Sequence, residues 1–147
     1  MYKVLLVDDE ALIREAISEN TRWKELGYEL MGTCKNGREA IERLDQEEAD
    51  LVLTDICMPY VDGMELTRYL YEKHKGVKVI IISGYDDFEY AKTAVKYQVM
   101  DYILKPITAK ELAQTLTRVK EKLDEERFQR SDMKRIRGAY MSNLPIL

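Results

Sequence analysis

Residues 77–83 read VKVIIIS, an apolar run that is interrupted by Lys78 and ends in a hydroxyl. Val and Ile favour strands, and a strand this apolar is typically covered on both faces, as in a parallel sheet with crossover helices. Four other short runs resemble it, so the sequence predicts an α/β fold with five strands. The other four predicted strands are Tyr2–Val7, Tyr28–Cys34, 51–54 and 102–104.

Amphipathic segments separate and follow these runs, and they predict one helix after each strand. The first, at Ala11–Asn20, places Leu12, Ile13, Ala16 and Ile17 on one face. Others are expected after the turn at residues 36–37, at Gly63–Lys73 and at 88–97. Thr108, with Glu111 three residues later, predicts the start of a long last helix. Its predicted apolar stripe consists of Leu112, Leu116, Val119 and Leu123.

Polar residues stand at the carboxyl ends of four predicted strands. An open parallel sheet binds its ligand beyond these ends, so residues there should carry the chemistry of any site. Taken alone, each has a plainer interpretation as a turn, a helix cap or a strand end. Their joint placement indicates a site. The residues are Asp8, Asp9 and Glu10 after the first strand, Asp55 after the third, Ser83 at the fourth and Lys105 after the fifth.

Carboxylates gathered in this way repel one another unless a cation neutralises them. Mg²⁺ is the expected cation, since it takes one or two carboxylates at phosphoryl sites. One carboxylate can then attack a phosphoryl group, while a Lys spreads the charge and a hydroxyl adds a hydrogen bond. The set therefore suits the formation and sensing of an aspartyl phosphate.

These motifs resemble the receiver domain of two-component response regulators over roughly residues 2–122. Residues 83–91, SGYDDFEYA, further resemble receivers of the YesN/AraC type. The resemblance implies a doubly wound, flavodoxin-like five-stranded parallel sheet with strand order 2-1-3-4-5. Helices would cover both faces, and the C-terminal helix would be extended. The motifs are VDDE at residues 7–10, LTDICMP at 53–59, DG at 62–63, SG at 83–84 and LKP at 104–106.

The resemblance also implies a role for each matching residue. Asp55 would be the phosphoacceptor, and Lys105 would pair with the phosphoryl group. Ser83, which replaces a commoner Thr, would be the switch hydroxyl, and Tyr102 would reorient with it. The bond before Pro106 would be cis, as only X-Pro bonds readily are. The implied Mg²⁺ ligands are Asp8, Asp9, Asp55 and the backbone carbonyl of Cys57.

A domain of this kind implies a sensor histidine kinase as partner, with no enzymatic activity beyond self-phosphorylation and autodephosphorylation. The phosphoryl group would bias a two-state equilibrium and change the surface of the fourth helix, fifth strand and fifth helix. That change is expected to promote a homodimer and to control a transcriptional output.

Composition limits the remaining possibilities. The net charge of -4 makes the chain a poor nucleic-acid binder, so DNA contact is expected only through a separate output domain. The two cysteines, Cys34 and Cys57, match no metal or disulfide spacing, which suggests a reduced cytoplasmic location. No run is apolar enough for a signal peptide or a membrane span.

The predicted organisation is a receiver domain at residues 1–122 and a helical linker or dimerisation tail at 123–147, with an output domain expected beyond. Phe128, Met133 and Ile136 break the heptad spacing in this tail.

Two rival functions fit the sequence less well. A phosphatase of the haloacid-dehalogenase type needs a second Asp two residues after its nucleophile, where this chain has Cys57. A phosphorylation-independent, receiver-like interaction module is the second rival. Such modules commonly lose an acid of the pair, the acceptor or the lysine, and all of these are present.

Overall fold

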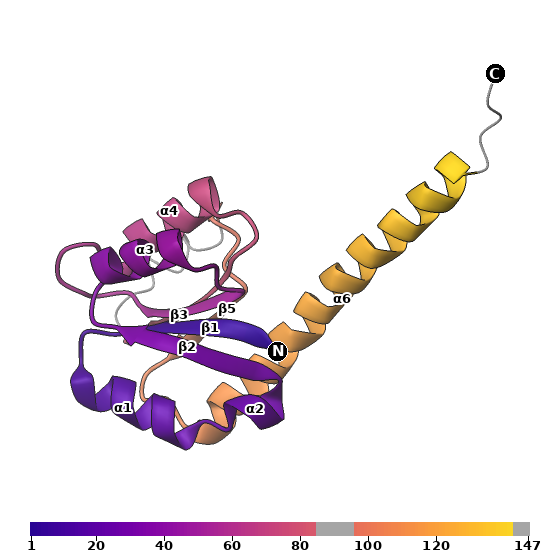
Figure 1. The fold of residues 1–147 in the computed structure, drawn as a ribbon. Helices are drawn as coiled ribbons and strands as arrows, with labels where there is room; N and C mark the ends of the chain where they lie inside the picture. Colours follow the sequence, from indigo (N-terminus) through magenta and orange to yellow (C-terminus); the bar gives the residue numbers. More distant parts are fainter. Residues whose placement is uncertain (85–95, 143–147) are drawn as a thin grey trace.

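The computed structural model describes residues 1–84 and 96–142 and contains one five-stranded parallel sheet (Figure 1). The strand order is β2-β1-β3-β4-β5, as predicted. All four neighbouring strand pairs are parallel, so the carboxyl ends of the strands lie along one edge. The strands are β1 (Tyr2–Val7), β2 (Tyr28–Cys34), β3 (Leu51–Asp55), β4 (Lys78–Ser83) and β5 (Asp101–Leu104).

Helices cover both faces of the sheet (Figure 1). One face carries α1 (Ala11–Asn20), the short α2 (Trp23–Leu26) and the start of α6 (Ala109–Ser142). The other carries α3 (Gly37–Gln46) and α4 (Gly63–Lys73).

Strand alternation divides the core into two parts. Val4 and Leu6 of β1 belong to a cluster with Ile17 of α1. Leu5 and Val7 belong to a second cluster, which includes residues of α3 and α4. Because β1 is buried on both faces, nearly every one of its residues is apolar, as a central parallel strand requires.

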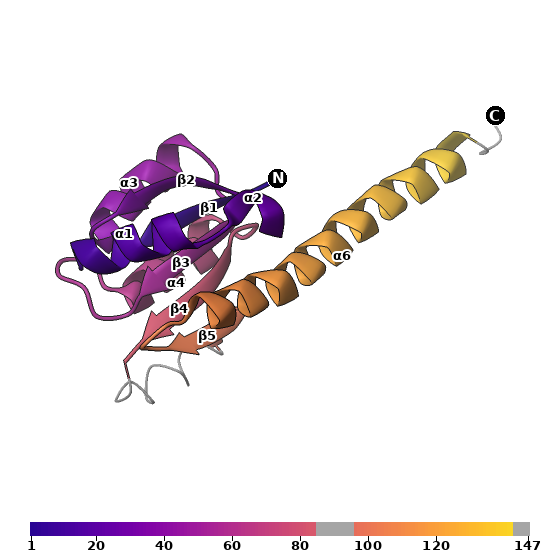
Figure 2. The ribbon, with the colours of Figure 1, turned by 90° about the horizontal axis from the view of Figure 1, so that it is seen from below.

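The long helix α6 begins against the sheet and then extends away from it (Figure 2). The Thr108 hydroxyl accepts the Glu111 N–H at 3.1 Å, which confirms the predicted cap. The four residues of the predicted stripe, Leu112, Leu116, Val119 and Leu123, are all buried. Beyond the stripe, Phe128, Met133 and Ile136 are exposed.

Two polar contacts anchor α6 where it leaves the domain. The Tyr2 hydroxyl donates to Asp124 at 2.6 Å, and Lys78 pairs with Glu126 at 2.9 Å. The base of the projecting helix is therefore fixed to β1 and β4.

Helix α1 corrects part of the predicted pattern. Ile17 is buried and Ile13 is half-buried, but Leu12 is 80% exposed and Ala16 is also exposed. One residue subtends about 100° on a helix, so Leu12 and Ala16 lie beside the inward stripe of Ile13 and Ile17.

The short helix α2 was not predicted, and the helix expected before β5 cannot be compared. Four residues are too few to show a helical period, so no sequence signal indicated α2. This helix buries Trp23 and ends at Gly27, which has a left-handed backbone with φ 91°. The helix expected at 88–97 lies largely outside the described residues. No helix in the described part of the chain is long and apolar enough to cross a membrane.

Candidate phosphoacceptor and metal site

The loop that follows β1 forms one side of the site. Asp8 is fully buried, and its backbone N–H donates to the Cys34 carbonyl at 3.0 Å. Its Oδ1 accepts the Glu10 N–H at 2.9 Å, and its backbone carbonyl accepts from Arg14 Nη1 at 2.6 Å. These hydrogen bonds fix both the backbone and the carboxylate of Asp8.

Asp55 ends β3 and is only 4% exposed. The chain after it folds back closely, because the Gly63 N–H donates to the Ile56 carbonyl at 2.8 Å. A Cβ at Gly63 would lie 2.1 Å from the Asp55 carbonyl oxygen, so this approach requires glycine. Asp62 then caps α4 by accepting the Glu65 N–H at 2.8 Å. The Asp62-Gly63 pair therefore starts α4 and holds the loop against Asp55.

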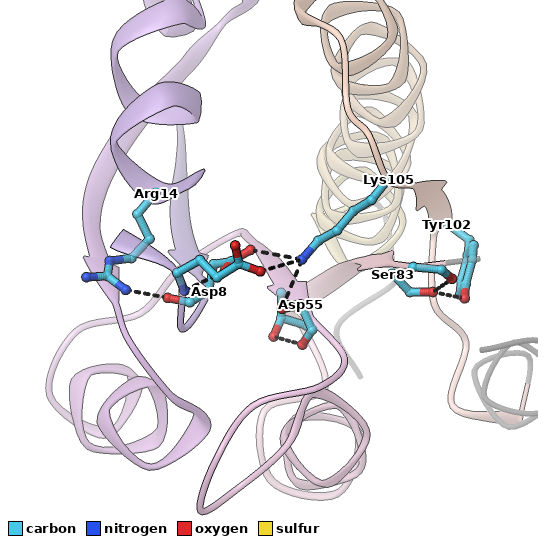
Figure 3. A network of polar contacts seen from close by, with 9 residues as sticks. Asp8, Arg14, Asp55, Ser83, Tyr102 and Lys105 are labelled. Atoms are coloured by element: carbon cyan, nitrogen blue, oxygen red, sulfur yellow. Dashed lines mark hydrogen bonds and ion pairs between the residues drawn. The ribbon is translucent and has the colours of Figure 1, made fainter. Parts of the chain in front are cut away.

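Lys105 joins the acidic residues (Figure 3). Its Nζ lies 3.2 Å from Asp55 Oδ2, 3.7 Å from Asp8 Oδ2 and 3.8 Å from Glu10 Oε1. Its backbone N–H donates to the Ser83 carbonyl at 2.7 Å, and the bond to Pro106 is cis. Residues from the ends of β1, β3 and β5 thus meet around one ammonium group.

The ionised forms of the carboxylates in this cluster are disfavoured by burial and by mutual repulsion. Burial, together with the neighbouring Asp8, raises the pKa of Asp55 to about 6, although Lys105 opposes the shift. Burial also raises the pKa of Asp8, with Asp9 and Glu10 adding to the effect. Burial would lower the pKa of Lys105, but Asp55 and Asp8 together raise it. One ammonium group therefore leaves the site short of positive charge.

The geometry of the acidic residues fits a divalent cation. Asp8 Oδ2 is buried and accepts no hydrogen bond from any residue that the structure describes. Ligand atoms of Asp8, Asp9 and Glu10 lie within 4.8 Å of one another. Buried polar atoms normally have a partner, so an unsatisfied carboxylate oxygen beside exposed acids suits a hydrated, oxygen-seeking ion such as Mg²⁺.

The remaining predicted residues lie around this cluster. Ser83 and Tyr102 hydrogen-bond to each other through their hydroxyls, and the Ser83 hydroxyl also donates to the Gly84 carbonyl at 2.9 Å. They form a separate pair to one side of Lys105 (Figure 3). Asp9, whose carboxylate lies near those of Asp8 and Glu10, is exposed, and so is Cys57.

Two residues at the site were given no specific role by the sequence prediction, although Glu10 was named with the acidic pair. Glu10 reaches Lys105, and its position directly after the acidic pair was a visible signal. Arg14 contacts the Asp8 carbonyl from α1, which sequence alone does not reveal, because an exposed helical Arg gives the same pattern.

Comparison with known proteins agrees with this fold. The family model for the response regulator receiver domain matches residues 4–117. The chain belongs to this family and is a receiver domain of a two-component response regulator.

Within the family, the chain is of the YesN/AraC type. It is 39% identical over 119 residues to the transcriptional regulatory protein YesN of Bacillus subtilis, covering 81% of this chain and 32% of YesN. It is 38% identical over 129 residues to the transcriptional regulatory protein HptR of Staphylococcus aureus, covering 88% of this chain and 50% of HptR. The chain therefore spans a third to a half of the length of these relatives.

A solved structure supports the same assignment. The receiver domain of AraT, a response regulator from Geobacillus stearothermophilus, is 41% identical with a TM-score of 0.81. The match covers 86% of this chain and 98% of that domain.

Proposed function

We propose that the protein is a phosphorylation-dependent signalling receiver that accepts a phosphoryl group on Asp55. The observation that carries the proposal is the meeting of Asp55, Asp8 and Lys105 at one edge of the sheet, with Asp8 Oδ2 unsatisfied. A structural ion pair would leave no buried carboxylate oxygen without a hydrogen bond, whereas a cation-dependent phosphoryl site would.

The chain's own groups would divide the work as follows. A carboxylate oxygen of Asp55 receives the phosphoryl group, whose bond to the donor breaks as the new P–O bond forms. Lys105 Nζ, already 3.2 Å from Asp55 Oδ2, neutralises a phosphoryl oxygen. The burial of Asp55 excludes bulk water and strengthens these interactions.

The acidic residues would hold Mg²⁺. Asp8, Asp9 and Asp55 would provide carboxylates, and the backbone carbonyl of Cys57 would be a further ligand. Mg²⁺ supplies positive charge that screens the carboxylates from one another and from the incoming phosphoryl group.

Ser83 and Tyr102 would report the phosphorylation. The Ser83 hydroxyl now donates to the Gly84 carbonyl and is hydrogen-bonded to Tyr102, and a phosphoryl oxygen at Asp55 would offer it a competing acceptor. If Ser83 turns toward that oxygen, its hydrogen bond to Tyr102 breaks, and Tyr102 would move inward. A ligand shifts such an equilibrium by its differential affinity for the two arrangements.

The wider role follows from the family and the relatives. A sensor histidine kinase would supply the phosphoryl group in the cytoplasm. The relatives' names describe transcriptional regulators, so we propose a transcriptional output in which DNA contact falls to segments outside residues 1–147. Residues 1–122 would form the receiver, and residues 123–147 would form a linker or dimerisation tail.

Intact-mass spectrometry after incubation with Mg²⁺ and acetyl phosphate tests the central step. One phosphoryl adduct is expected on the wild-type chain, and none on Asp55→Asn or in excess EDTA. The absence of an adduct on the wild-type chain with acetyl phosphate or with a phosphorylated kinase domain would favour the phosphorylation-independent module instead.

A further inference from the structure

Arg14 makes an unusual contact for a residue in the first turns of a surface helix. Its guanidinium turns back toward the site and donates from Nη1 to the Asp8 carbonyl at 2.6 Å (Figure 3). Its own backbone N–H bonds to the Glu10 carbonyl at 3.0 Å. Arg14 therefore connects both ends of the acidic loop, residues 8–10, to the start of α1.

The contact completes the restraint of Asp8. The backbone N–H of Asp8 is held by Cys34, and its Oδ1 is held by the N–H of Glu10. The third hydrogen bond is at the backbone carbonyl of Asp8, and it is the one whose donor belongs to a side chain, that of Arg14. With these positions fixed, Oδ2 is the remaining carboxylate atom, and it faces Lys105 at 3.7 Å.

The restraint opposes a definite force. Asp8 is buried, and the ligand atoms of Asp9 and Glu10 lie within 4.8 Å of its own, so repulsion between like charges favours an outward movement of the loop. A hydrogen bond from a charged guanidinium is shorter and stronger than a neutral one, and it acts on the backbone of the loop. Groups that orient a metal ligand in this way commonly affect metal affinity without touching the ion.

We propose that Arg14 is a positioning residue, which holds Asp8 in the orientation that binds Mg²⁺. The proposal rests on the proposed function, because it requires a metal at the acidic cluster. It predicts that loss of the Arg14 contact weakens Mg²⁺ binding beyond any general loss of stability. The positive charge of Arg14 has the opposite effect on Mg²⁺ affinity, since removal of a nearby cation should by itself strengthen Mg²⁺ binding.

The chain contains a matched control. Arg43 of α3 also donates from its guanidinium to a backbone carbonyl, that of Met31 in β2, at 3.0 Å. Arg43 also pairs with Glu47 at 3.1 Å. Arg43→Gln therefore removes the same kind of contact, but between α3 and β2 and not at the acidic loop.

The experiment measures the Mg²⁺ dissociation constant by isothermal titration calorimetry on metal-free wild type, Arg14→Gln, Arg14→Lys and Arg43→Gln. Urea unfolding in EDTA gives the stability of each variant. We expect Arg14→Gln to weaken binding about tenfold. Arg14→Lys, which keeps the charge and one donor group, should recover part of the loss. Arg43→Gln should bind like the wild type whatever stability it loses.

The proposal would be overturned if Arg14→Gln weakened Mg²⁺ binding by less than threefold or strengthened it. Equal weakening of Mg²⁺ binding in Arg43→Gln would also overturn it. If Arg14→Gln does not fold, Arg14→Lys decides, and Mg²⁺ binding by Arg14→Lys that is indistinguishable from that of the wild type would overturn the proposal. Failure of the wild type to bind Mg²⁺ would instead overturn the proposed function, so the two failures are distinguishable.

Discussion

The raised pKa of Asp55 leads to a prediction about stability. Its pKa is about 6 in the folded protein, against 3.8 for a free carboxyl group. Above pH 6, the folded state must hold a charge that burial and Asp8 disfavour. Each pKa unit corresponds to about 1.4 kcal/mol, so ionised Asp55 lowers the free energy of unfolding by about 3 kcal/mol at pH 7.

The sign of the pH dependence follows from proton binding. Between pH 3.8 and about 6, folded Asp55 binds more protons than unfolded Asp55. Stability therefore falls as pH rises through this window, and the whole penalty is present at pH 7. At pH 4 folded Asp55 is protonated, and the penalty is below about 1 kcal/mol.

Asp55→Asn replaces this carboxylate with a neutral group of the same shape. In EDTA at pH 7, we expect the variant to unfold with a free energy about 2 to 3 kcal/mol higher than that of the wild type. Urea titration followed by the fluorescence of buried Trp23 measures the difference. The gain should shrink at pH 4, where Asp55 no longer carries a charge.

The matched control is Glu72→Gln, which neutralises an exposed acid of α4 and should change stability by less than about 0.5 kcal/mol. A variant Asp55→Asn that is no more stable than the wild type at pH 7 would refute the electrostatic reasoning. So would a gain of the same size at pH 4 and pH 7.

Two further predictions concern packing around the site and the sheet. Gly63→Ala places a Cβ 2.1 Å from the Asp55 carbonyl and should lower the free energy of unfolding by about 2 kcal/mol or more, measured by urea unfolding. Gly76→Ala is its control, because the added Cβ would meet no atom of the described residues within 4 Å; equal losses would contradict the steric explanation. Tyr28→Phe removes a buried hydrogen bond of 2.7 Å to a carbonyl of α6 and should cost about 1 kcal/mol in the same assay. Exposed Tyr60→Phe should have no measurable effect, and an unchanged Tyr28→Phe would mean that the bond adds nothing to stability.

The projecting helix α6 is anchored at the edge of the sheet opposite the candidate site. Asp124 and Glu126 anchor α6 to Tyr2 and Lys78, at the edge of the sheet opposite the carboxyl ends of the strands.

Residue pattern alone predicted most of the layered fold. Val79 to Ile82 are apolar without a break, because a parallel strand covered on both faces has no polar side. The stripe of α6 was equally visible, since a helix against a sheet buries one residue every three or four. Helix α2 was not visible, because four residues are too few to show a period. The sequence prediction wrongly placed Leu12 on the buried face of α1. An apolar residue next to a buried stripe cannot be distinguished from one inside the stripe by sequence spacing alone.

By itself, the sequence determined which residues end the strands, and hence that acids, a hydroxyl and a lysine gather at one edge. Parallel strands share a direction, so residues 50 positions apart, such as Asp55 and Lys105, must come together there. Only the tertiary structure decided how they meet: that Lys105 lies between Asp55 and Asp8, that Asp8 Oδ2 accepts no hydrogen bond from the residues described, and that Arg14 donates to the Asp8 carbonyl. Those facts depend on side-chain directions and on contacts between elements, which a pattern of residue types does not encode.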